Sequence, residues 1–234
     1  MIDKPVMIIT GTSKGIGRYL AEYYIDNGFI VVGCSRSDMD IQLSNYQHYC
    51  LDICNESLVK KMFREVRKKY GRLDVLINNA GISSENHVLL TPLKKAQDSL
   101  DTNFIGTFIF CRESVKLMKI NQYGRIINIS SIHVPLASVG TSIYGASKAA
   151  IEQFSGVLAR EVFQFGITTN ILSLSVVKDT GMEHALAQKI KEKILDQTIS
   201  KEQIDIHDVI NSVNFLIDEK SKMVCNQILY LGGV

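Results

Sequence analysis

Long apolar runs are missing from this 234-residue sequence, and so are clusters of basic residues. A membrane-spanning helix needs about 20 consecutive apolar residues, and no run reaches that length. The formal net charge is only +2, which disfavours binding to nucleic acid or to a membrane surface. The N-terminal residues MIDKPVMIITG lack the basic flank, long apolar stretch and cleavage site of a signal peptide. We therefore expect a cytoplasmic globular protein.

The five cysteines form no CxxC pair and are spaced irregularly. An odd number at irregular spacing argues against a disulfide framework in a chain of this size. Cys50 and Cys54 lie four residues apart, but no histidine or second cysteine pair completes a zinc site. The sequence therefore predicts reduced cysteines and no bound metal.

Proline is rare, with three residues in the chain, and no linker, repeat or low-complexity segment is recognisable. The length fits one large domain. Apolar residues make up 46% of the chain, which is enough for a substantial core. Residues 1–234 are therefore predicted to form a single domain.

Short β-branched runs alternate along the chain with longer stretches of helical periodicity. This alternation indicates βαβ units and a parallel sheet, and right-handed crossovers place helices on both of its faces. The predicted fold is therefore an α/β, doubly wound, Rossmann-type domain. The predicted strands span residues 6–9, 29–32, 46–51, 73–77, 125–129, 168–174 and 228–231, and the predicted helices span residues 18–24, 56–70, 101–119, 144–163 and 206–217.

A glycine-rich segment, TGTSKGIG, directly follows the first predicted strand. Glycine allows a tight turn and a close approach of the backbone to a pyrophosphate. The N-terminus of the following helix offers free N–H groups and a partial positive charge. A glycine turn without a ligand is the alternative, and the position between strand and helix disfavours it. The segment is predicted to bind a dinucleotide through Gly11, Ser13, Lys14, Gly15, Ile16 and Gly17.

The end of the second predicted strand bears on the choice between NAD and NADP. Folds that prefer NAD place an acidic residue there, to bind the ribose hydroxyls, but this sequence has Ser35 followed by Arg36. Arg36, together with Lys14 of the glycine segment, suits a 2′-phosphate, which arginine can bind with two parallel hydrogen bonds. The sequence therefore predicts NADP(H). Asp38 and Asp40 lie nearby and keep open the alternative that both cations are only solvated.

Residues suited to acid–base catalysis follow in the segments IINISSIH and YGASK. Tyr144 and Lys148 are four residues apart on a predicted helix, so they share one face. A nearby ammonium favours the ionised phenol, so Tyr144 can give a proton to a developing alkoxide or take one from an alcohol. Lys148 can also hold the ribose hydroxyls of the cofactor. Ser131 ends a parallel strand at the edge where such sheets bind ligands, and its hydroxyl can bind the substrate oxygen.

Motifs of these types in this order resemble those of the classical short-chain dehydrogenase/reductases, and the resemblance covers essentially the whole chain. It implies about seven strands and a homodimer or homotetramer. It selects Ser131 rather than Ser130, because the family's catalytic serine lies thirteen residues before the tyrosine. It also implies a proton relay through Asn103 in DTNFIG. Further cofactor contacts are implied for Asp52 and Ile53 in the segment LDI and for Asn79, Ala80 and Gly81 in the segment NNAG.

Two segments depart from the family pattern. Leu174 and Ser175 replace the usual Pro-Gly, which affects the loop beside the nicotinamide. A threonine of that loop usually contacts the nicotinamide carboxamide. Spacing places this role on Asp179, but Thr180 fits better because Met182 then completes a T-x-M pattern. Near the C-terminus, NQILYLGG replaces GQ…DGG, so the assembly is expected to differ.

Among the members of this family, the chain looks most like the 3-oxoacyl-(acyl-carrier-protein) reductases. That branch carries arginines beside the mouth of the active site, whereas the matching positions here hold Gln122 and Phe165. A free ketone, a sugar intermediate or a small keto-acid is therefore a comparable alternative. Residues 182–200 are predicted to form a substrate lid, whose mixed polarity does not identify the substrate.

Two other functional classes remain open. A nucleotide-binding regulator on the same fold would need no catalytic residues, so Asn103, Ser131, Tyr144 and Lys148 argue against it. An epimerase or dehydratase with tightly held NAD is disfavoured because Ser35, and no acidic residue, stands at the end of the second predicted strand.

The predicted helix at residues 144–163 is apolar over much of its circumference, which is typical of a helix buried on more than one side. We expect a two-fold-related subunit to cover the rest of this helix's apolar surface. The interface would also include the predicted helix at residues 101–119. A monomer with a few exposed apolar residues is the alternative. The apolar side chains are those of Ile151, Phe154, Val157, Leu158, Val162 and Phe163.

Overall fold

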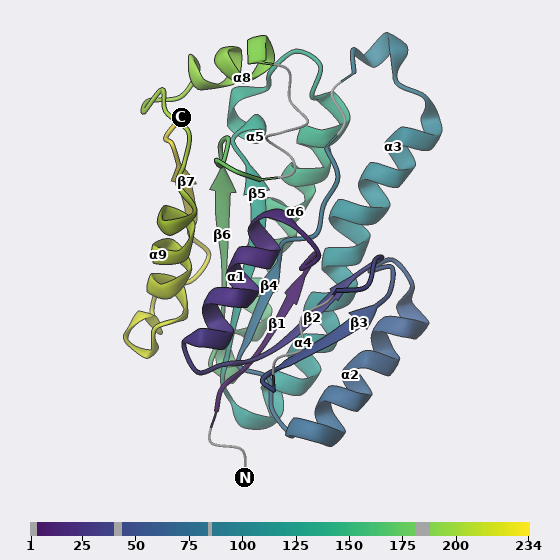
Figure 1. Ribbon diagram of the computed structural model, residues 1–234, viewed down its shortest axis with the longest axis vertical. Coiled ribbons are helices and arrows are strands. Elements are labelled where there is room, and N and C mark those ends of the chain that lie inside the picture. The colour runs from purple at the N-terminus through teal and green to yellow at the C-terminus, as the bar shows by residue number, and fades with distance from the viewer. Residues whose placement is uncertain (1–3, 40–43, 84–85, 181–187) are drawn as a thin grey trace.

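The computed structural model describes residues 4–39, 44–83, 86–180 and 188–234. Its strands form one seven-stranded sheet in which all neighbouring strands run parallel (Figure 1). All seven predicted strands are present. In spatial order they are β3 (Tyr46–Cys50), β2 (Ile30–Ser35), β1 (Val6–Thr10), β4 (Val75–Asn78), β5 (Gly124–Ser131), β6 (Ile167–Leu174) and β7 (Ile228–Leu231).

The helices cover both faces of the sheet, which confirms the predicted doubly wound α/β fold. Each face has its own apolar core, and the sheet separates the two. The helices are α1 (Gly15–Asp26), α2 (Glu56–Tyr70), α3 (Leu93–Leu100), α4 (Gly106–Asn121), α5 (His133–Leu136), α6 (Ser142–Val162), α8 (Gln188–Leu195) and α9 (Ile206–Ile217), with 3₁₀ turns η1 (Val88–Leu90), η3 (Phe163–Phe165) and η4 (Glu219–Ser221).

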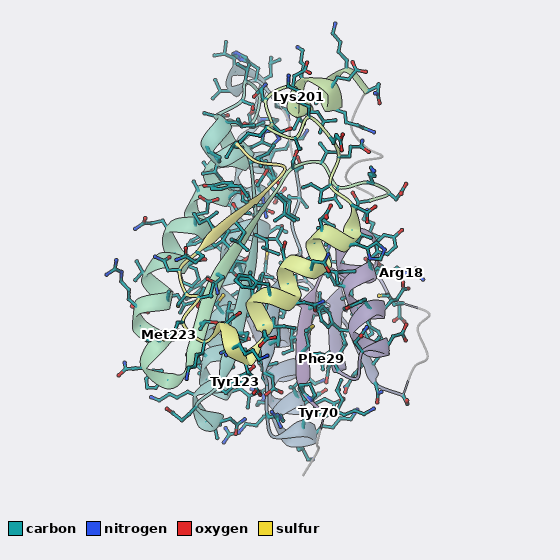
Figure 2. The ribbon with its side chains drawn as sticks, turned by 90° about the vertical axis from the view of Figure 1, so that its left-hand side faces the viewer. Arg18, Phe29, Tyr70, Tyr123, Lys201 and Met223 are labelled. Carbon is teal, nitrogen blue, oxygen red and sulfur yellow. The ribbon has the colours of Figure 1, made fainter. Side chains whose placement is uncertain are left out.

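Helices α1 and α9 pack on one face of the sheet, and α2, α4 and α6 pack on the other. Figure 2 shows α9 lying along the sheet between Lys201 and Met223. The strand order changes direction between β1 and β4, because β2 lies on one side of β1 and β4 on the other. Ligands of such sheets bind beyond the carboxyl ends of the strands at this point.

The helix predicted to begin at residue 101 in fact begins at Leu93, so that boundary is wrong. Pro92 precedes the first turn, with a φ of −65°. Proline is common at helix starts. The apolar residues Leu93, Ala96 and Leu100 lie at helical spacing. Leu93 and Leu100 are exposed, and only Ser99 is buried. A π-helical turn, η2 (Asp101–Ile105), joins α3 to α4.

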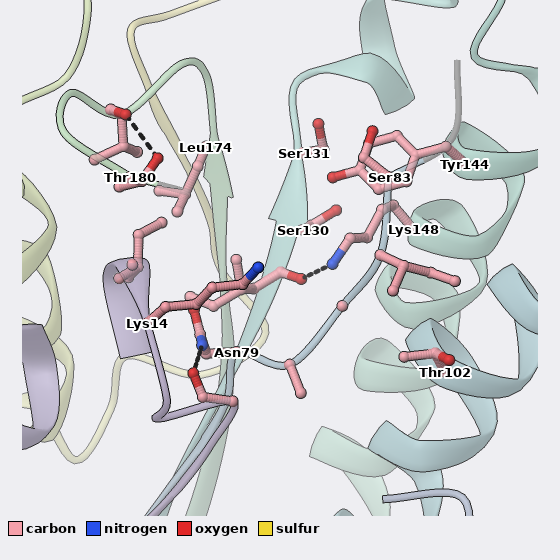
Figure 3. Close-up of a pocket in the computed structure, with 18 of the residues that line it drawn as sticks. Lys14, Asn79, Ser83, Thr102, Ser130, Ser131, Tyr144, Lys148, Leu174 and Thr180 are labelled. Atoms are coloured by element: carbon pink, nitrogen blue, oxygen red, sulfur yellow. Dashed lines mark hydrogen bonds between the residues drawn. The ribbon is translucent and has the colours of Figure 1, made fainter. Parts of the chain in front are cut away.

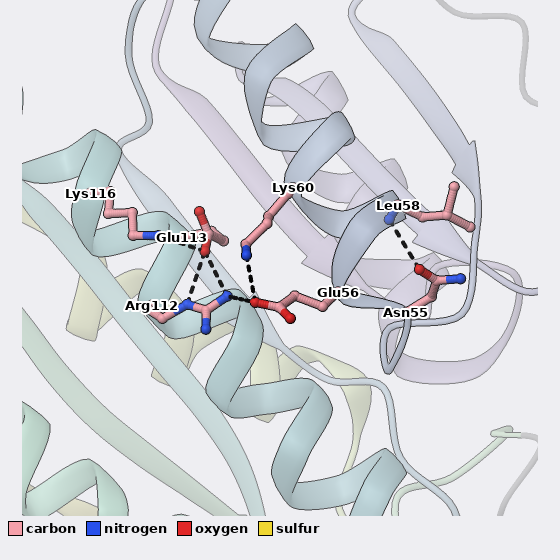
Figure 4. A network of polar contacts seen from close by, with 7 residues as sticks. All are labelled: Asn55, Glu56, Leu58, Lys60, Arg112, Glu113 and Lys116. Atoms are coloured by element: carbon pink, nitrogen blue, oxygen red, sulfur yellow. Dashed lines mark hydrogen bonds and ion pairs between the residues drawn. The ribbon is translucent and has the colours of Figure 1, made fainter.

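A network of ion pairs holds the start of α2 against α4 (Figure 4). Arg112 pairs with Glu56 at 2.7 Å and with Glu113 at 2.8 Å. Lys60 also contacts Glu56, and Lys116 contacts Glu113. Hydrogen bonds from Lys60 and Arg112 lower the pKa of the Glu56 carboxyl to about 2. The network therefore anchors the N-terminal end of α2, directly after the loop that follows β3.

Gly17 lies where α1 crosses the loop after β1, and the backbone there leaves no room for a side chain. A Cβ atom would come within 2.3 Å of the Gly11 carbonyl oxygen and 2.4 Å of Asn79 Nδ2. We expect Gly17→Ala to lower the free energy of unfolding by about 1–3 kcal/mol, as overpacking typically does. Urea denaturation measures it. The control is Gly145→Ala, where the nearest atom is 3.4 Å away. Equal stability of the two variants would contradict the prediction.

Within the described ranges, no helix combines the length and apolarity needed to cross a membrane. The same ranges hold no group of three or more His, Cys, Asp or Glu side chains placed to bind a metal ion. All five cysteines are free thiols.

Candidate active site

A cavity of about 960 Å³ opens at the carboxyl ends of the central strands, beside the change in strand direction. It brings together nearly all of the residues predicted from the sequence to bind the cofactor or to act in catalysis. Asn103 and Gly17 are the two predicted residues that do not line it. The predicted residues that do line it are Gly11, Ser13, Lys14, Gly15, Ile16, Ser35, Arg36, Asp52, Ile53, Asn79, Ala80, Gly81, Ser131, Tyr144, Lys148 and Thr180.

The loop between β1 and α1 forms one wall of the cavity. Gly11 and Gly15 have φ angles of +76° and +58°, a region that favours glycine. The loop is tied to the segment after β4: Thr10 Oγ1 accepts from the backbone N–H groups of Asn79 (3.0 Å) and Ala80 (2.9 Å). Asn79 Nδ2 also donates to the Thr10 carbonyl oxygen at 2.9 Å. These contacts fix the loop beside the start of α1, whose first backbone N–H groups have no partner within the helix and can bind a phosphate.

At the end of β2, the cavity wall carries more positive than negative charge. Ser35 is buried, and its hydroxyl donates to the Ser37 carbonyl oxygen at 2.5 Å. Lys14 and Arg36 are exposed at the cavity rim, and within the described residues no side chain pairs with the Arg36 guanidinium. Asp38 accepts from the backbone N–H of Met39, and Asp40 lies outside the described residues. The wall therefore offers two cations to an anionic group.

Tyr144 and Lys148 lie on one face of α6, and Figure 3 shows the Tyr144 and Ser131 side chains directed into the same space. The Lys148 ammonium lies 5.9 Å from the centre of the Tyr144 ring and donates to the Ile129 carbonyl oxygen at 2.8 Å. Burial lowers the pKa of Lys148 to about 8, although the Glu152 carboxylate opposes the shift. Lys148 is therefore predominantly charged at neutral pH and close to the phenol.

The two adjacent serines of β5 have different surroundings. Ser130 donates to Glu152 Oε1 of α6 at 2.6 Å, so its hydroxyl hydrogen is already used in a hydrogen bond. Ser131 Oγ accepts from the backbone N–H of His133 at 3.3 Å, and its O–H can still be donated. The geometry therefore favours Ser131 as the serine that meets a substrate oxygen, in agreement with the sequence prediction.

Asn103 is fully buried in the π-helical turn η2. Its side chain binds the backbone of Ile82 twice, accepting from the N–H at 2.8 Å and donating to the carbonyl oxygen at 3.0 Å, and it donates to Ser147 at 2.9 Å. These contacts position the segment after β4 against α6. Asn103 thus supports the cavity wall in this structure, and the predicted proton relay through it stays a prediction.

The loop after β6 places Thr180 rather than Asp179 at the cavity. Thr180 is buried and donates to the Val177 carbonyl oxygen at 2.9 Å, whereas Asp179 is exposed with a φ of +56°. Leu174 and Ser175, which replace Pro-Gly, also line the cavity. Met182, the basis for preferring Thr180, lies outside the described residues.

The predicted lid, residues 182–200, is described from residue 188 onward. Its helix α8 lies beyond the carboxyl ends of β5 and β6 (Figure 1). Ile190 and Ile194 of α8 line the cavity together with Val176. The described part of the segment therefore borders the space next to Tyr144 with apolar side chains.

Gln122 and Phe165 do not lie beside the cavity mouth, so the family-based expectation about these two positions is wrong within this chain. Gln122 follows α4, and Phe165 precedes β6. Both lie at the amino ends of β5 and β6, a full strand length from the cavity at the carboxyl ends. Their identity therefore says nothing about the charge at this subunit's own cavity mouth.

Sequence reasoning missed several lining residues, of which His133 and Ser83 are the polar ones next to Tyr144 and Ser131. His133 stands two positions after Ser131, and this short spacing was the available signal. Ser83 follows the NNAG segment. The apolar lining residues carry no sequence signature of their own.

Comparisons with known proteins agree with this geometry. A family model described as short chain dehydrogenase matches residues 5–191. The 3-oxoacyl-(acyl-carrier-protein) reductase FabG of Escherichia coli is 29% identical over 234 residues, which cover 97% of this chain and 96% of that protein. The FabG of Staphylococcus epidermidis is 30% identical over 236 residues, with coverages of 97% and 96%.

Solved structures share the fold. The structure of ElxO with NADP bound has a TM-score of 0.88 and 28% identity, and the match covers 97% of this chain and 96% of that one. A short chain dehydrogenase from Leptospira borgpetersenii with bound NAD⁺ has a TM-score of 0.89 at 24% identity, with coverages of 98% and 92%.

Proposed function

The chain belongs to the short chain dehydrogenase family, and we propose that it uses NADP(H) to interconvert a ketone and a secondary alcohol, with Tyr144 as general acid and base. The observation that carries the proposal is the placement of Tyr144, Lys148 and Ser131 around one cavity that continues to the glycine loop. The test is the oxidation of NADPH, followed by its absorbance, with a panel of ketones. A protein that binds NADPH but reduces no ketone would instead support a nucleotide-binding regulator.

The residues present fit a nicotinamide dinucleotide. Gly11 and Gly15 leave the loop after β1 open to a pyrophosphate. Lys148 lines the same cavity as Tyr144. When bound, the cofactor supplies or accepts the hydride. Lys14 in the loop after β1 and Arg36 directly after β2 support NADP rather than NAD, because their charges complement a 2′-phosphate.

In the reductive direction, the chain's own residues handle the ketone oxygen. Ser131 donates a hydrogen bond to that oxygen, and Tyr144 gives it the proton as negative charge develops. The Lys148 ammonium stabilises the phenolate that remains. In the oxidative direction the phenolate removes the alcohol proton. The buried position of Lys148 strengthens its electrostatic effect on the phenol.

The substrate end of the cavity supports an uncharged ketone. Its described wall near Tyr144 includes Ile132, Val176, Ile190 and Ile194, and apart from the Lys148 ammonium the polar groups there are neutral. A 3-oxoacyl compound, as the FabG relatives' name says of them, fits such a wall. A small apolar ketone fits equally. Among the described lining residues on this side, a phosphorylated sugar would find only the Lys148 ammonium, which already donates to the Ile129 carbonyl oxygen.

We propose a homo-oligomer that packs through α4 and α6. Val157 on α6 is 48% exposed, and Ile105 and Phe163 at neighbouring helix ends are also exposed. Phe154, in contrast, packs edge-on against Phe104 and Phe108 within the chain. We expect Val157→Glu to shift the protein toward monomer, because the charge would be buried in the interface. Light scattering at micromolar concentration measures the shift.

Two results decide this prediction. Lys68→Glu, an exposed change on α2 and outside both proposed interface helices, serves as the control for added negative charge. A wild-type protein that is a stable monomer would refute the homo-oligomer. An unchanged oligomer in Val157→Glu would place the interface elsewhere.

A further inference from the structure

His133 is held in a fixed place beside the two hydroxyl groups of the candidate active site. It begins α5, and its backbone N–H donates to Ser131 Oγ at 3.3 Å. Its carbonyl oxygen accepts from Ala137 at 3.2 Å. Its ring meets the Tyr144 ring edge-on, with centres 5.9 Å apart and an angle of 75° between the planes. The imidazole is therefore positioned relative to both Ser131 and Tyr144.

The imidazole has hydrogen-bonding capacity that the protein does not use. The side chain is only 8% exposed, and Nδ1 is buried without a hydrogen-bond partner among the described residues. Burial lowers the pKa of His133, so the ring is neutral at neutral pH and carries one donor and one acceptor. An unpartnered buried polar group is costly and calls for an explanation. Nδ1 itself is closed to solvent, so a ligand in the adjoining cavity would bind the ring at the edge that lines the cavity.

The described surroundings of the ring offer no competing charge. Ile132 and Val176 line the same cavity as His133, and the ring contacts Tyr144. His133 also lines a second, smaller cavity together with His87 and Val134. Lys148 is engaged with the Ile129 carbonyl oxygen. Among the described residues that line the cavity around the ring, Ser131 and Tyr144 are neutral and Ile132 and Val176 are apolar.

We propose that His133 contacts the substrate and hydrogen-bonds a second oxygen, one or two carbons away from the carbonyl carbon. This inference rests on the proposed function, because the ketone oxygen is taken to lie between Tyr144 and Ser131. Hydrogen bonds of about 2.7–3 Å place that oxygen close to both hydroxyls, and the neighbouring imidazole then faces the adjacent carbons. The preferred substrates are ketones with an oxygen on such a carbon and an apolar remainder.

The test compares matched ketones in wild type and two variants. Ethyl 3-oxobutanoate and 2,3-heptanedione carry the second oxygen, and 2-heptanone has a chain of similar length without it. His133→Phe keeps the ring against Tyr144 but removes both nitrogens, and His133→Asn keeps hydrogen-bonding atoms. In His133→Phe we expect kcat/KM for the two oxygenated ketones to fall on the order of 10-fold, with a change of less than about threefold for 2-heptanone. His133→Asn should recover part of the loss.

For each ketone, the readout is kcat/KM of the variant divided by kcat/KM of the wild type. Differences in intrinsic reactivity between the ketones cancel in this ratio. A loss of the same factor on all three ketones, or no loss on any, would overturn the assignment of His133 while leaving the reductase intact. A wild-type protein that reduces none of them with NADPH or NADH would count against the proposed function, and the role of His133 would fall with it. Unchanged NADPH affinity and melting temperature show that the variants are folded.

Discussion

Replacement of Tyr144 by phenylalanine is expected to lower kcat by roughly 10²- to 10⁴-fold, the range of a lost general acid or base. The ring would remain in place beside His133 and Lys148, because only the hydroxyl is removed. The ketone oxygen would then have the Ser131 hydroxyl but no proton donor. Cofactor affinity is expected to change by less than about threefold, since the proton-transfer step and not the cofactor site is altered. Steady-state kinetics and NADPH titration measure the two quantities.

Tyr19→Phe is the matched control, because Tyr19 is 40% exposed on α1 and does not line the cavity. It should behave as wild type in both measurements. A loss of kcat below tenfold in Tyr144→Phe would contradict the assignment of this residue as the acid. A large loss of NADPH affinity would show that the change had disturbed the cavity.

NADPH is expected to bind at least about tenfold more tightly than NADH, and Arg36→Ala should remove most of that preference. Hydrogen bonds to charged groups contribute about 1.5–3 kcal/mol, so the loss in NADPH affinity should be roughly 10- to 100-fold. NADH affinity should stay nearly constant because NADH has no 2′-phosphate. Fluorescence titration with both cofactors measures the effect. Arg160→Ala, an exposed change on α6 away from the cavity, is the control.

Ser35→Asp provides the opposite change, because its carboxylate would repel the 2′-phosphate and favour NADH. The structure adds a complication, since the Ser35 hydroxyl donates to the Ser37 carbonyl oxygen and lies 3.2 Å from His48 Nε2. A carboxylate cannot donate to that carbonyl, so this variant also disturbs the loop. Arg36→Ala is therefore the cleaner variant. Equal affinity of the unaltered protein for both cofactors would refute the NADP preference.

Local sequence patterns were sufficient for most of the fold. The predicted ranges of α2, α9 and β7 coincide with the observed ones. The two helices have a clear apolar period, and β7 is a short apolar run followed by two glycines. Helix α2, for example, begins after Asn55, whose side chain accepts from Leu58 N, and ends at Gly71 in the left-handed region. Helix α3 lies outside the predicted ranges although Leu93, Ala96 and Leu100 have helical spacing. Both leucines are exposed, so this stripe does not mark a face that packs on the sheet.

The candidate site was predictable where chemistry depends on spacing along the chain. Tyr144 and Lys148 share a helix face because they are four residues apart, and the glycine loop joins a strand to a helix. Gly17 and Asn103 show the limit. Both were assigned to the site as motif residues, yet Gly17 accommodates the close approach of Gly11, and Asn103 holds the backbone of Ile82. Motif spacing indicates that a residue matters without saying which contact it makes.

The sequence by itself determined the alternation of strands and helices, the phosphate loop and the Tyr–Lys pair, because these depend on residues close together in the chain. The tertiary structure alone decided the burial of Lys148, which lowers its pKa to about 8, and the different partners of Ser130 and Ser131. It also placed Gln122 and Phe165 at the far end of the sheet, and His133 against Tyr144. These properties depend on which segments pack together across the sheet. Such packing removes Lys148 from water and leaves His133 Nδ1 without a partner among the described residues, and no local sequence pattern encodes either effect.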